Sequence, residues 1–209
     1  MYISINIQAV CMQDEKSTRR SNESRTRETK AALLKAARKL FVEKGYAGTS
    51  TPEIVKKAGI TRGALYHHFE DKEALFRAVL VDEYEAVASE IYRSATGAPQ
   101  NTVEALMLGG TGFLNAMKDE GRVKLMLLDG PAVLGRQELD RIDRETSADE
   151  LRIGLEAAME SGEIRKLPLD ALTVQLSAMF DRAALSIADG DAMEPHVEIF
   201  AAFFNSLKK

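Results

Sequence analysis

The chain has 209 residues, of which 45% are hydrophobic and 29% charged, and its formal net charge is −4. This composition is typical of a globular protein, and no apolar run approaches the roughly 20 residues that a membrane-spanning helix needs. The sequence therefore predicts no membrane partner. Residues 1–10 lack a basic leader and a small-residue cleavage site, so we expect no secretory signal. Cys11 is the single cysteine and cannot form an internal disulfide, which favours a cytoplasmic protein.

The charge is unevenly distributed along the chain. Residues 1–75 contain 14 Lys+Arg and 9 Asp+Glu, whereas the remaining residues contain 14 and 23. Such an asymmetry suits a protein with one part that faces phosphates and another that stays away from them. Chance scatter of surface charge explains the asymmetry equally well, so charge alone does not decide between these two interpretations.

Glycine, proline and capping residues divide a sequence with helical periodicity into segments. Residues 1–24 are polar beyond Cys11 and lack periodicity, which predicts a flexible tail. Ser50 and Glu53 have the spacing of a capping box, and Thr61 and Asp71 are placed to cap the next two helices. The first four predicted helices span about 26–44, the short stretch between Ser50 and Gly59, 61–68 and 71–95.

The rest of the chain also has the pattern of helices. Gly130-Pro131 is expected to break one helix, Gly162 to end another, and residues 189–191 to form a turn between the last two. We therefore predict an all-α protein with a first helical domain at 25–72 and a second helical domain at 73–209. The predicted helices of the second domain span 101–119, 121–128, 136–161, 169–188 and 194–207.

The stretch from Ser50 to His68 has the spacing of a helix-turn-helix motif. Two short helices are joined by a tight turn at Gly59, and Leu65 and Phe69 are expected to anchor the second helix in the core. A helix that enters the major groove needs small or hydrogen-bonding residues at its start. Arg62 suits guanine, Gly63 leaves room for the groove, and Ala64 suits a thymine methyl group.

Donor side chains surround this helix. They are suited to DNA phosphates, whose contacts set affinity and register rather than sequence choice. Partial burial is the alternative for Tyr66 and the two histidines. Adjacent histidines on a helix point about 100° apart, so we expect no metal at His67-His68. The candidate phosphate contacts are Thr51, Tyr66, His67, His68 and Lys72.

Residues 27–80 resemble the DNA-binding domain of the tetracycline-repressor (TetR/AcrR) family. The resemblance rests on Thr61 to Phe69 (TRGALYHHF), on Asp71 to Phe76 (DKEALF), and on Gly45-Tyr46 and Gly48-Thr49-Ser50. It implies base-proximal roles for Arg62, Gly63, Ala64 and His67. It implies phosphate roles for Thr51, Tyr66, His68 and Lys72. It also implies a homodimer on a palindromic operator, with a ligand that changes the spacing of the two recognition helices.

In this family the C-terminal helices bind a small effector and form the dimer. Methionine suits an adaptable apolar site, although methionine at helical spacing is more often ordinary core. The sequence Gly109-Gly110-Thr111-Gly112 is not a phosphate loop and is expected to let helices approach closely or to kink one. The candidate ligand residues are Met107, Phe113, Met117, Met126, Asp129, Leu155, Met179 and Arg182.

The last two predicted helices carry apolar residues three and four positions apart. Paired hairpins from two chains would form a four-helix interface, and ordinary core within one chain is the alternative. The candidate dimer residues are Leu172, Leu176, Met179, Ala183, Val197, Phe200, Phe203 and Phe204.

Two other functions are alternatives to a ligand-responsive repressor. An enzyme would need a catalytic arrangement such as the pair Asp129 and Asp181, or Asp181 with Arg182, but we find no catalytic triad, metal cluster or nucleotide loop, and we predict no catalytic residue and no cofactor. An activator, or a helix-turn-helix protein used only for protein contacts, has the same sequence features as a repressor. The prediction is a homodimeric repressor that a small, largely apolar ligand releases from its operator.

Overall fold

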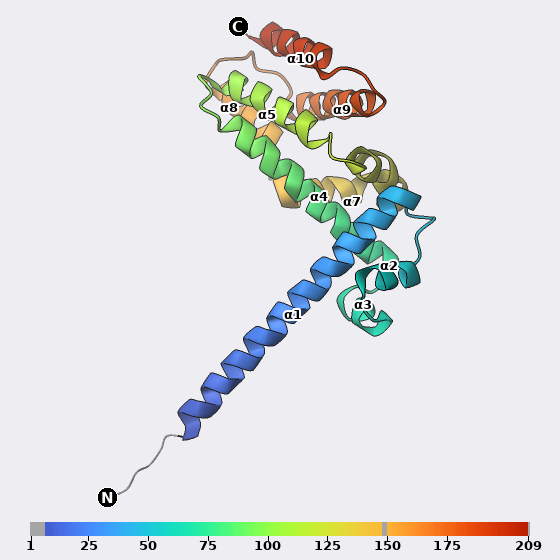
Figure 1. Ribbon diagram of the computed structural model, residues 1–209. Coiled ribbons are helices and arrows are strands. Elements are labelled where there is room, and N and C mark those ends of the chain that lie inside the picture. Colours follow the sequence, from blue (N-terminus) through green and yellow to red (C-terminus); the bar gives the residue numbers. More distant parts are fainter. Residues whose placement is uncertain (1–6, 148–149, 209) are drawn as a thin grey trace, which may run out of the picture. The chain divides into compact units, whose positions relative to one another are not determined.

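The computed structural model describes residues 7–147 and 150–208, and their regular secondary structure is helical apart from one isolated bridge between Ile164 and Lys208 (Figure 1). The all-α prediction is therefore confirmed. The chain forms two compact units, residues 1–75 and 76–209. No helix in the described part of the chain combines the length and the apolar character needed to cross a membrane.

The first unit contains three helices and the start of a fourth. They are α1 (Ile7–Lys44), α2 (Thr51–Ala58), α3 (Arg62–His68) and the first residues of α4 (Lys72–Ala95). Apolar side chains that recur three and four positions apart on α1 are buried with one residue from α2 and one from α3. The fully buried members of this core are Leu33, Ala37, Phe41, Ile54 and Leu65.

The prediction of a flexible tail over 1–24 differs from the structure, in which α1 begins at Ile7 rather than near Thr26. Residues 1–6 lie outside the described residues. The stretch from Ile7 to Lys44 contains neither glycine nor proline, so nothing in the sequence stops a helix that is nucleated at its buried end. The prediction relied on apolar periodicity, which an exposed helix does not need.

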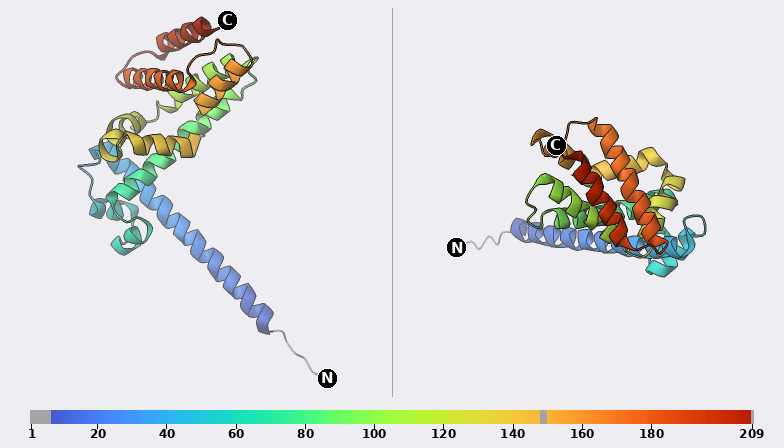
Figure 2. Two further views of the ribbon diagram at one scale, coloured as in Figure 1. Left: turned by 180° about the vertical axis from the view of Figure 1, so that it is seen from behind. Right: turned by 90° about the horizontal axis from the view of Figure 1, so that it is seen from above.

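The second unit is built from the rest of α4 and the helices that follow. The range 136–161, predicted as one helix, contains two described helices on either side of residues 148–149. After α4, the helices of the second unit are α5 (Thr102–Ala116), η1 (Lys124–Asp129), α6 (Gly130–Leu134), α7 (Arg136–Ser147), α8 (Glu150–Glu160), α9 (Leu169–Ala188) and α10 (Met193–Leu207). Figure 2 shows α9 and α10 as a hairpin.

The predicted helix at 121–128 is a π-helix, η1, and the predicted break at Gly130-Pro131 is a continuation. The Gly130 N–H bonds to the Leu125 carbonyl, five residues back, and Pro131 lies in the first turn of α6, where no N–H is needed. A Cβ on Gly130 would come within 2.9 Å of that carbonyl oxygen. The helix ends at Gly135, with φ of 79°. The helical backbone therefore continues through Pro131 instead of breaking there.

The glycines of α5 let neighbouring helices approach closely, as predicted. A Cβ on Gly110 would lie 2.5 Å from the Phe180 ring of α9, and one on Gly112 would lie 2.6 Å from Ser94 Oγ of α4. On α8, Gly154 similarly leaves room for Leu106 of α5. These small residues let α4, α8 and α9 pack closely on α5.

Gly112→Ala is expected to lower the free energy of unfolding by about 1–3 kcal/mol, since its Cβ would also lie 3.0 Å from the Glu90 carbonyl oxygen, and the backbone must move. Gly109→Ala on the same helix is the matched control. Its Cβ would make ordinary contacts of 3.5 Å with Ile91 and 3.7 Å with Ala95, so we expect no loss or a small gain in stability. Urea unfolding checks both variants, and equal stabilities would contradict the packing described here.

Candidate nucleic-acid interface

Local hydrogen bonds fix α2 and α3. Glu53 accepts hydrogen bonds from the N–H of Ser50 at 3.0 Å and from its hydroxyl at 2.8 Å, and Gly59 ends α2 in the left-handed conformation. The Thr61 hydroxyl accepts from the Ala64 N–H at 3.2 Å at the start of α3. The turn between the two helices is thus set by residues that the sequence had identified.

One face of α3 is exposed and the other is buried. Leu65 is fully buried and Phe69 is 6% exposed, which confirms both as anchors. Arg62, Gly63 and His67 are exposed, and no atom lies within 4 Å of a Cβ built on Gly63. The start of α3 is therefore open to a groove of DNA, as a recognition helix requires.

Tyr66 joins the two helices on the exposed side. Hydrogen bonds from Thr51 on α2 and from Arg62 lower the pKa of Tyr66. The Arg62 guanidinium lies 5.5 Å from the centre of the Tyr66 ring, and the ring is 42% exposed. Three predicted contact residues therefore form one polar cluster on the surface.

The two histidines differ in exposure. His67 is exposed, whereas His68 is half-buried, and burial is the main cause that lowers the pKa of His68, followed by the charges of His67 and Lys30. Their rings lie 5.3 Å apart. In the part of the chain that the structure describes, no third ligand joins them in a metal-binding group.

Two residues that were not predicted contribute to the site: Lys44, which contacts Glu53, and Tyr46, which contacts Lys72. Lys44 at the end of α1 donates to Glu53 at 2.5 Å, and this contact is the main cause that lowers the pKa of Glu53 to about 2. The pair holds the start of α2 against the end of α1. The sequence gives only a weak signal for this ion pair, because Lys44 and Glu53 lie nine residues apart across a turn and are not related by helical spacing.

Lys72, a predicted phosphate contact, instead donates hydrogen bonds to backbone carbonyls of its own chain. Its ammonium donates to the carbonyls of Tyr46 at 2.9 Å and Thr49 at 3.0 Å, and lies 4.1 Å from the centre of the Tyr46 ring. Thr49 is buried and its hydroxyl donates to the Leu40 and Gly45 carbonyls. The geometry thus favours a role in which Lys72 ties the start of α4 to the turn before α2.

Lys72→Met is expected to lower the free energy of unfolding by about 1.5–3 kcal/mol, because a charged donor to two carbonyls is lost. A phosphate contact would instead reduce the slope of log K against log salt concentration by about 1 upon substitution. We expect an unchanged slope for Lys72→Met, measured by fluorescence anisotropy on DNA. Unchanged stability with a reduced slope would restore the phosphate role, and Lys56→Met on the exposed side of α2 is the control.

Comparison with known proteins agrees with this geometry. A family profile for bacterial regulatory proteins of the tetR family matches residues 33–79, and one for the tetracyclin repressor-like C-terminal domain matches residues 103–207. The chain belongs to the TetR family.

Relatives and solved structures of TetR-family proteins extend over most of the chain. The transposon Tn10 TetC protein of Escherichia coli is 26% identical over 190 residues, covering 86% of this chain and 92% of its own. The transcriptional repressor AcnR of Corynebacterium glutamicum is 25% identical and covers 85% and 91%. A TetR-family regulator from Pectobacterium atrosepticum superposes with a TM-score of 0.66 at 27% identity, covering 88% of this chain and 94% of its own. The chain is a DNA-binding transcription regulator, and this family is not one of enzymes.

The candidate ligand residues of this TetR-family chain lie in the second unit and differ in exposure. Arg182 is exposed, whereas the methionines and Leu155 are buried or half-buried. Phe113 contacts Phe180, with ring centres 6.0 Å apart. Asp129 has a buried Oδ2 atom that has no hydrogen-bond partner among the described residues. The fully or nearly buried candidates are Met117, Met126 and Leu155, and the half-buried ones are Met107, Phe113, Asp129 and Met179.

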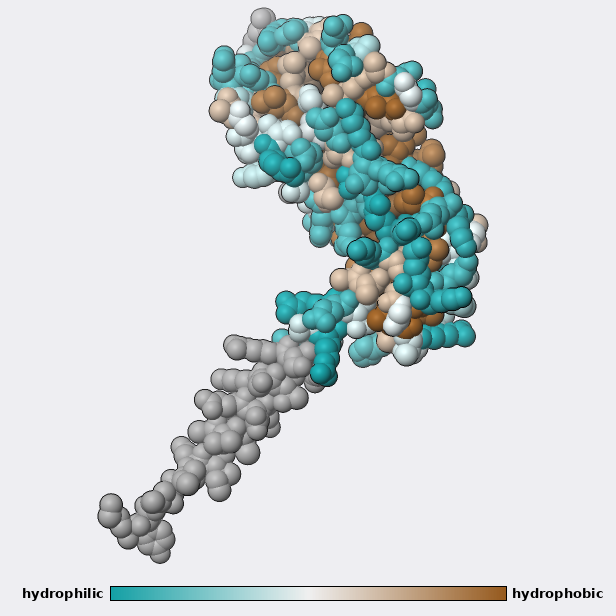
Figure 3. All heavy atoms as spheres, in the orientation of Figure 1, coloured by the Kyte–Doolittle hydropathy of each residue, from teal (hydrophilic) through white to brown (hydrophobic). Residues whose placement is uncertain are grey.

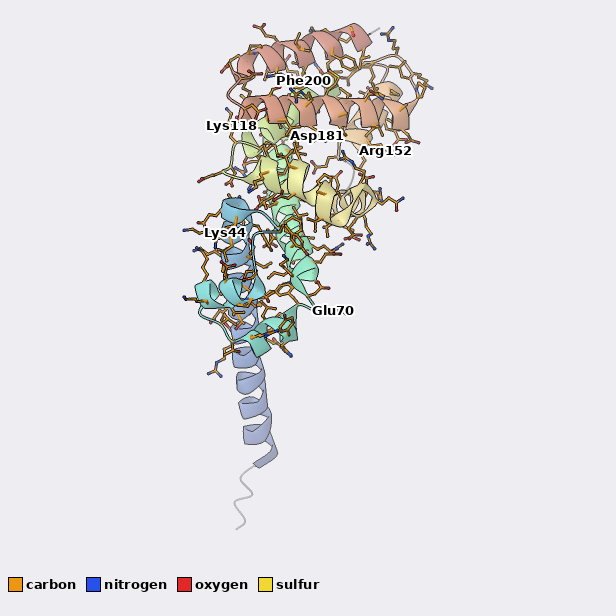
Figure 4. All side chains as sticks on the ribbon, turned by 90° about the vertical axis from the view of Figure 1, so that its right-hand side faces the viewer. Lys44, Glu70, Lys118, Arg152, Asp181 and Phe200 are labelled. Atoms are coloured by element: carbon orange, nitrogen blue, oxygen red, sulfur yellow. The ribbon has the colours of Figure 1, made fainter. Side chains whose placement is uncertain are left out.

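Four of the eight candidate dimer residues lie in the core of the second unit, which corrects their assignment to a surface. Phe200, labelled on α10 in Figure 4, has its ring centre 4.2 Å from that of Phe180 on α9. Val174 on α9 and Ile199 on α10, which were not predicted, are 63% and 62% exposed. The four buried residues are Leu176, Ala183, Phe200 and Phe204, and the half-buried ones are Leu172, Met179, Val197 and Phe203.

Proposed function

We propose that the protein is a homodimeric repressor that binds a palindromic operator in the cytoplasm. The observation that carries this proposal is the surface cluster of exposed Arg62 and Tyr66 with half-buried Thr51 at the open start of α3, with Gly63 beside it. Two copies of α3 in successive major grooves would read two half-sites related by the two-fold axis of the dimer. The relative AcnR is described as a repressor, which supports this direction of regulation over activation.

The exposed apolar residues of α9 and α10 support the dimer. Val174 and Ile199 are large apolar side chains that are mostly exposed in the single chain. Figure 3 shows hydrophobic side chains at the surface of the second unit. Covering such residues with a second copy removes apolar area from water, which favours association.

A small, largely apolar effector would bind within the second unit and release the operator. Six methionines follow residue 100, and the buried Asp129 oxygen, which has no hydrogen-bond partner among the described residues, offers an acceptor for a ligand donor. An effector of this kind must bind the two states of the protein with different affinities. Because α4 contains residues of both units, it is the element through which such a change would pass.

The experiment uses DNA selected from random-sequence duplexes by the purified protein. Arg62→Ala is expected to weaken specific binding by about 5- to 150-fold, equivalent to about 1–3 kcal/mol, and to relax the preference at one base position of each half-site. The palindromic site should bind two chains. Glu70→Gln, at an exposed position just beyond α3, is the control and should not lose affinity. Binding that is unaffected by both Arg62→Ala and Tyr66→Phe would refute α3 as the recognition helix.

A further inference from the structure

The N-terminal part of α1 has a composition unlike that of the rest of the helix. Every residue from 16 to 30 is charged or carries a hydroxyl or an amide, and the stretch contains no apolar side chain. It has two acidic residues, Glu23 and Glu28. Against these stand six cations: Lys16, Arg19, Arg20, Arg25, Arg27 and Lys30.

This segment continues α1 past the helix-turn-helix. The first fully buried residue of α1 is Leu33, and Lys30 lies close enough to α3 for its charge to lower the pKa of His68. In Figures 1 and 2, α1 extends beyond α2 and α3 in more than one view. At 1.5 Å per residue, the helix from Lys30 back to residue 16 spans about 21 Å.

The described cations of this segment are accessible. Arg25, Arg27 and Lys30 are exposed, and none of them forms an ion pair with another residue that the structure describes. Further along α1, by contrast, Lys39 and Lys44 pair with Glu43 and Glu53. The charge ahead of the core is thus available to a partner.

The helical register relates these cations to the buried side of α1. Lys30 lies seven residues before Ala37 and eleven before Phe41, both fully buried, so the three positions share one face of the helix. Arg27 lies next to Lys30 on that helix surface, three residues away. The face that packs within the first unit therefore becomes basic where it leaves the unit.

We propose that residues 16–30 of α1 form a basic arm that binds the phosphate backbone of the DNA flanking the half-site read by α3. The arm starts beside the end of α3, and DNA bound to α3 is the polyanion that lies within its length. A segment without apolar side chains has nothing to insert into a membrane, which favours DNA as the occupant. The proposal rests on operator binding through α3 and adds contacts outside the operator.

The test compares two duplexes that carry the same selected site, one ending at its edges and one with about 10 base pairs added on each side, roughly one helical turn. The arm variant is full-length Arg25→Gln/Arg27→Gln/Lys30→Gln. On the long duplex we expect at least tenfold weaker binding than wild type, and a slope of log K against log salt concentration reduced by about 0.9 for each lost phosphate contact. On the short duplex the two proteins should bind equally.

A control with the same change in net charge is Lys118→Gln/Arg144→Gln/Lys166→Gln, at exposed positions of the second unit. It should match wild type on both duplexes. The proposed arm would be refuted if the arm variant and this control bound the long duplex equally. It would also be refuted if the arm variant lost the same affinity on both duplexes. If Arg62→Ala weakens binding while the arm variant does not, only the arm is refuted; if no duplex is bound specifically, the proposed function itself is refuted.

Discussion

Arg122→Met is expected to lower the free energy of unfolding of the second unit by about 3–5 kcal/mol, the usual cost of removing one partner of a buried ion pair. Arg122 Nε donates to Glu83 Oε2 at 2.7 Å, and its Nη1 donates to the Ala116 carbonyl at 2.6 Å. Glu83 on α4 is only 3% exposed. Methionine keeps much of the arginine volume but removes both contacts, so the loss reflects charge and hydrogen bonding rather than a cavity.

Urea unfolding followed by circular dichroism measures this loss. The double variant Glu83→Gln/Arg122→Met should recover at least half of it, because a neutral amide costs less to bury than a carboxylate without its counterion. Arg93→Met is the control on α4, since Arg93 and Glu90 form an exposed pair at 2.9 Å that contributes about 0–1 kcal/mol. A stability of Arg122→Met within 1 kcal/mol of wild type would show that this pair does not hold α4 in the unit.

Part of this ion pair was visible in the sequence. Glu83 is four residues from Val79 and from Val87, so it lies on the apolar face of α4, where a charge requires a partner. The partner was not predictable, because Arg122 is 39 residues away in the chain and is brought near by the packing of α5. Periodicity thus identifies a buried charge but not the group that neutralises it.

The helix-turn-helix was predictable because its signals are local. Ser50 with Glu53, Gly59 and Thr61 act within one turn of their own positions, and the structure shows each in its predicted place. Lys72 differs, since a lysine beside a recognition helix suits a phosphate equally well as a carbonyl. The structure was needed to show that the carbonyls of the Gly45–Ser50 turn lie within hydrogen-bond distance of the Lys72 ammonium.

The second unit was less predictable because core, ligand site and dimer surface use the same residue types. Leu176 and Phe204 recur at helical spacing and are fully buried within their own chain. Val174 and Ile199 are apolar residues of the same two helices but are exposed. Which apolar stripe of a helix faces its own core depends on how α9 and α10 pack on α5, and that packing depends on Gly110 of α5 and the Phe180 ring.

Asp181 is a carboxyl group in this packed region, and its pKa is raised to about 6. Burial is the main cause, the negative charge of Asp143 adds to it, and the positive charge of Arg136 opposes it. Asp181 lies on α9 and is labelled in Figure 4. Burial and the charge of Asp143 likewise raise the pKa of Tyr84 on α4. The ionised form of Asp181 is thus disfavoured in the folded chain.

Asp181→Asn is therefore expected to stabilise the protein at pH 8 by about 3 kcal/mol and to change little at pH 4, given 1.36 kcal/mol for each pKa unit. The pKa of Asp181 is higher in the folded than in the unfolded chain, so the folded state binds more protons between pH 4 and 6. Wild-type stability consequently falls across this window as pH rises, and the variant escapes that loss. Thermal and urea unfolding at pH 4, 6 and 8 measure the difference in stability. Glu198→Gln, on the exposed side of α10, is the control and should differ from wild type by no more than about 0.5 kcal/mol at any pH. Destabilisation of Asp181→Asn at pH 8 would mean that the carboxylate is bound by a partner whose attraction exceeds the cost of burying it.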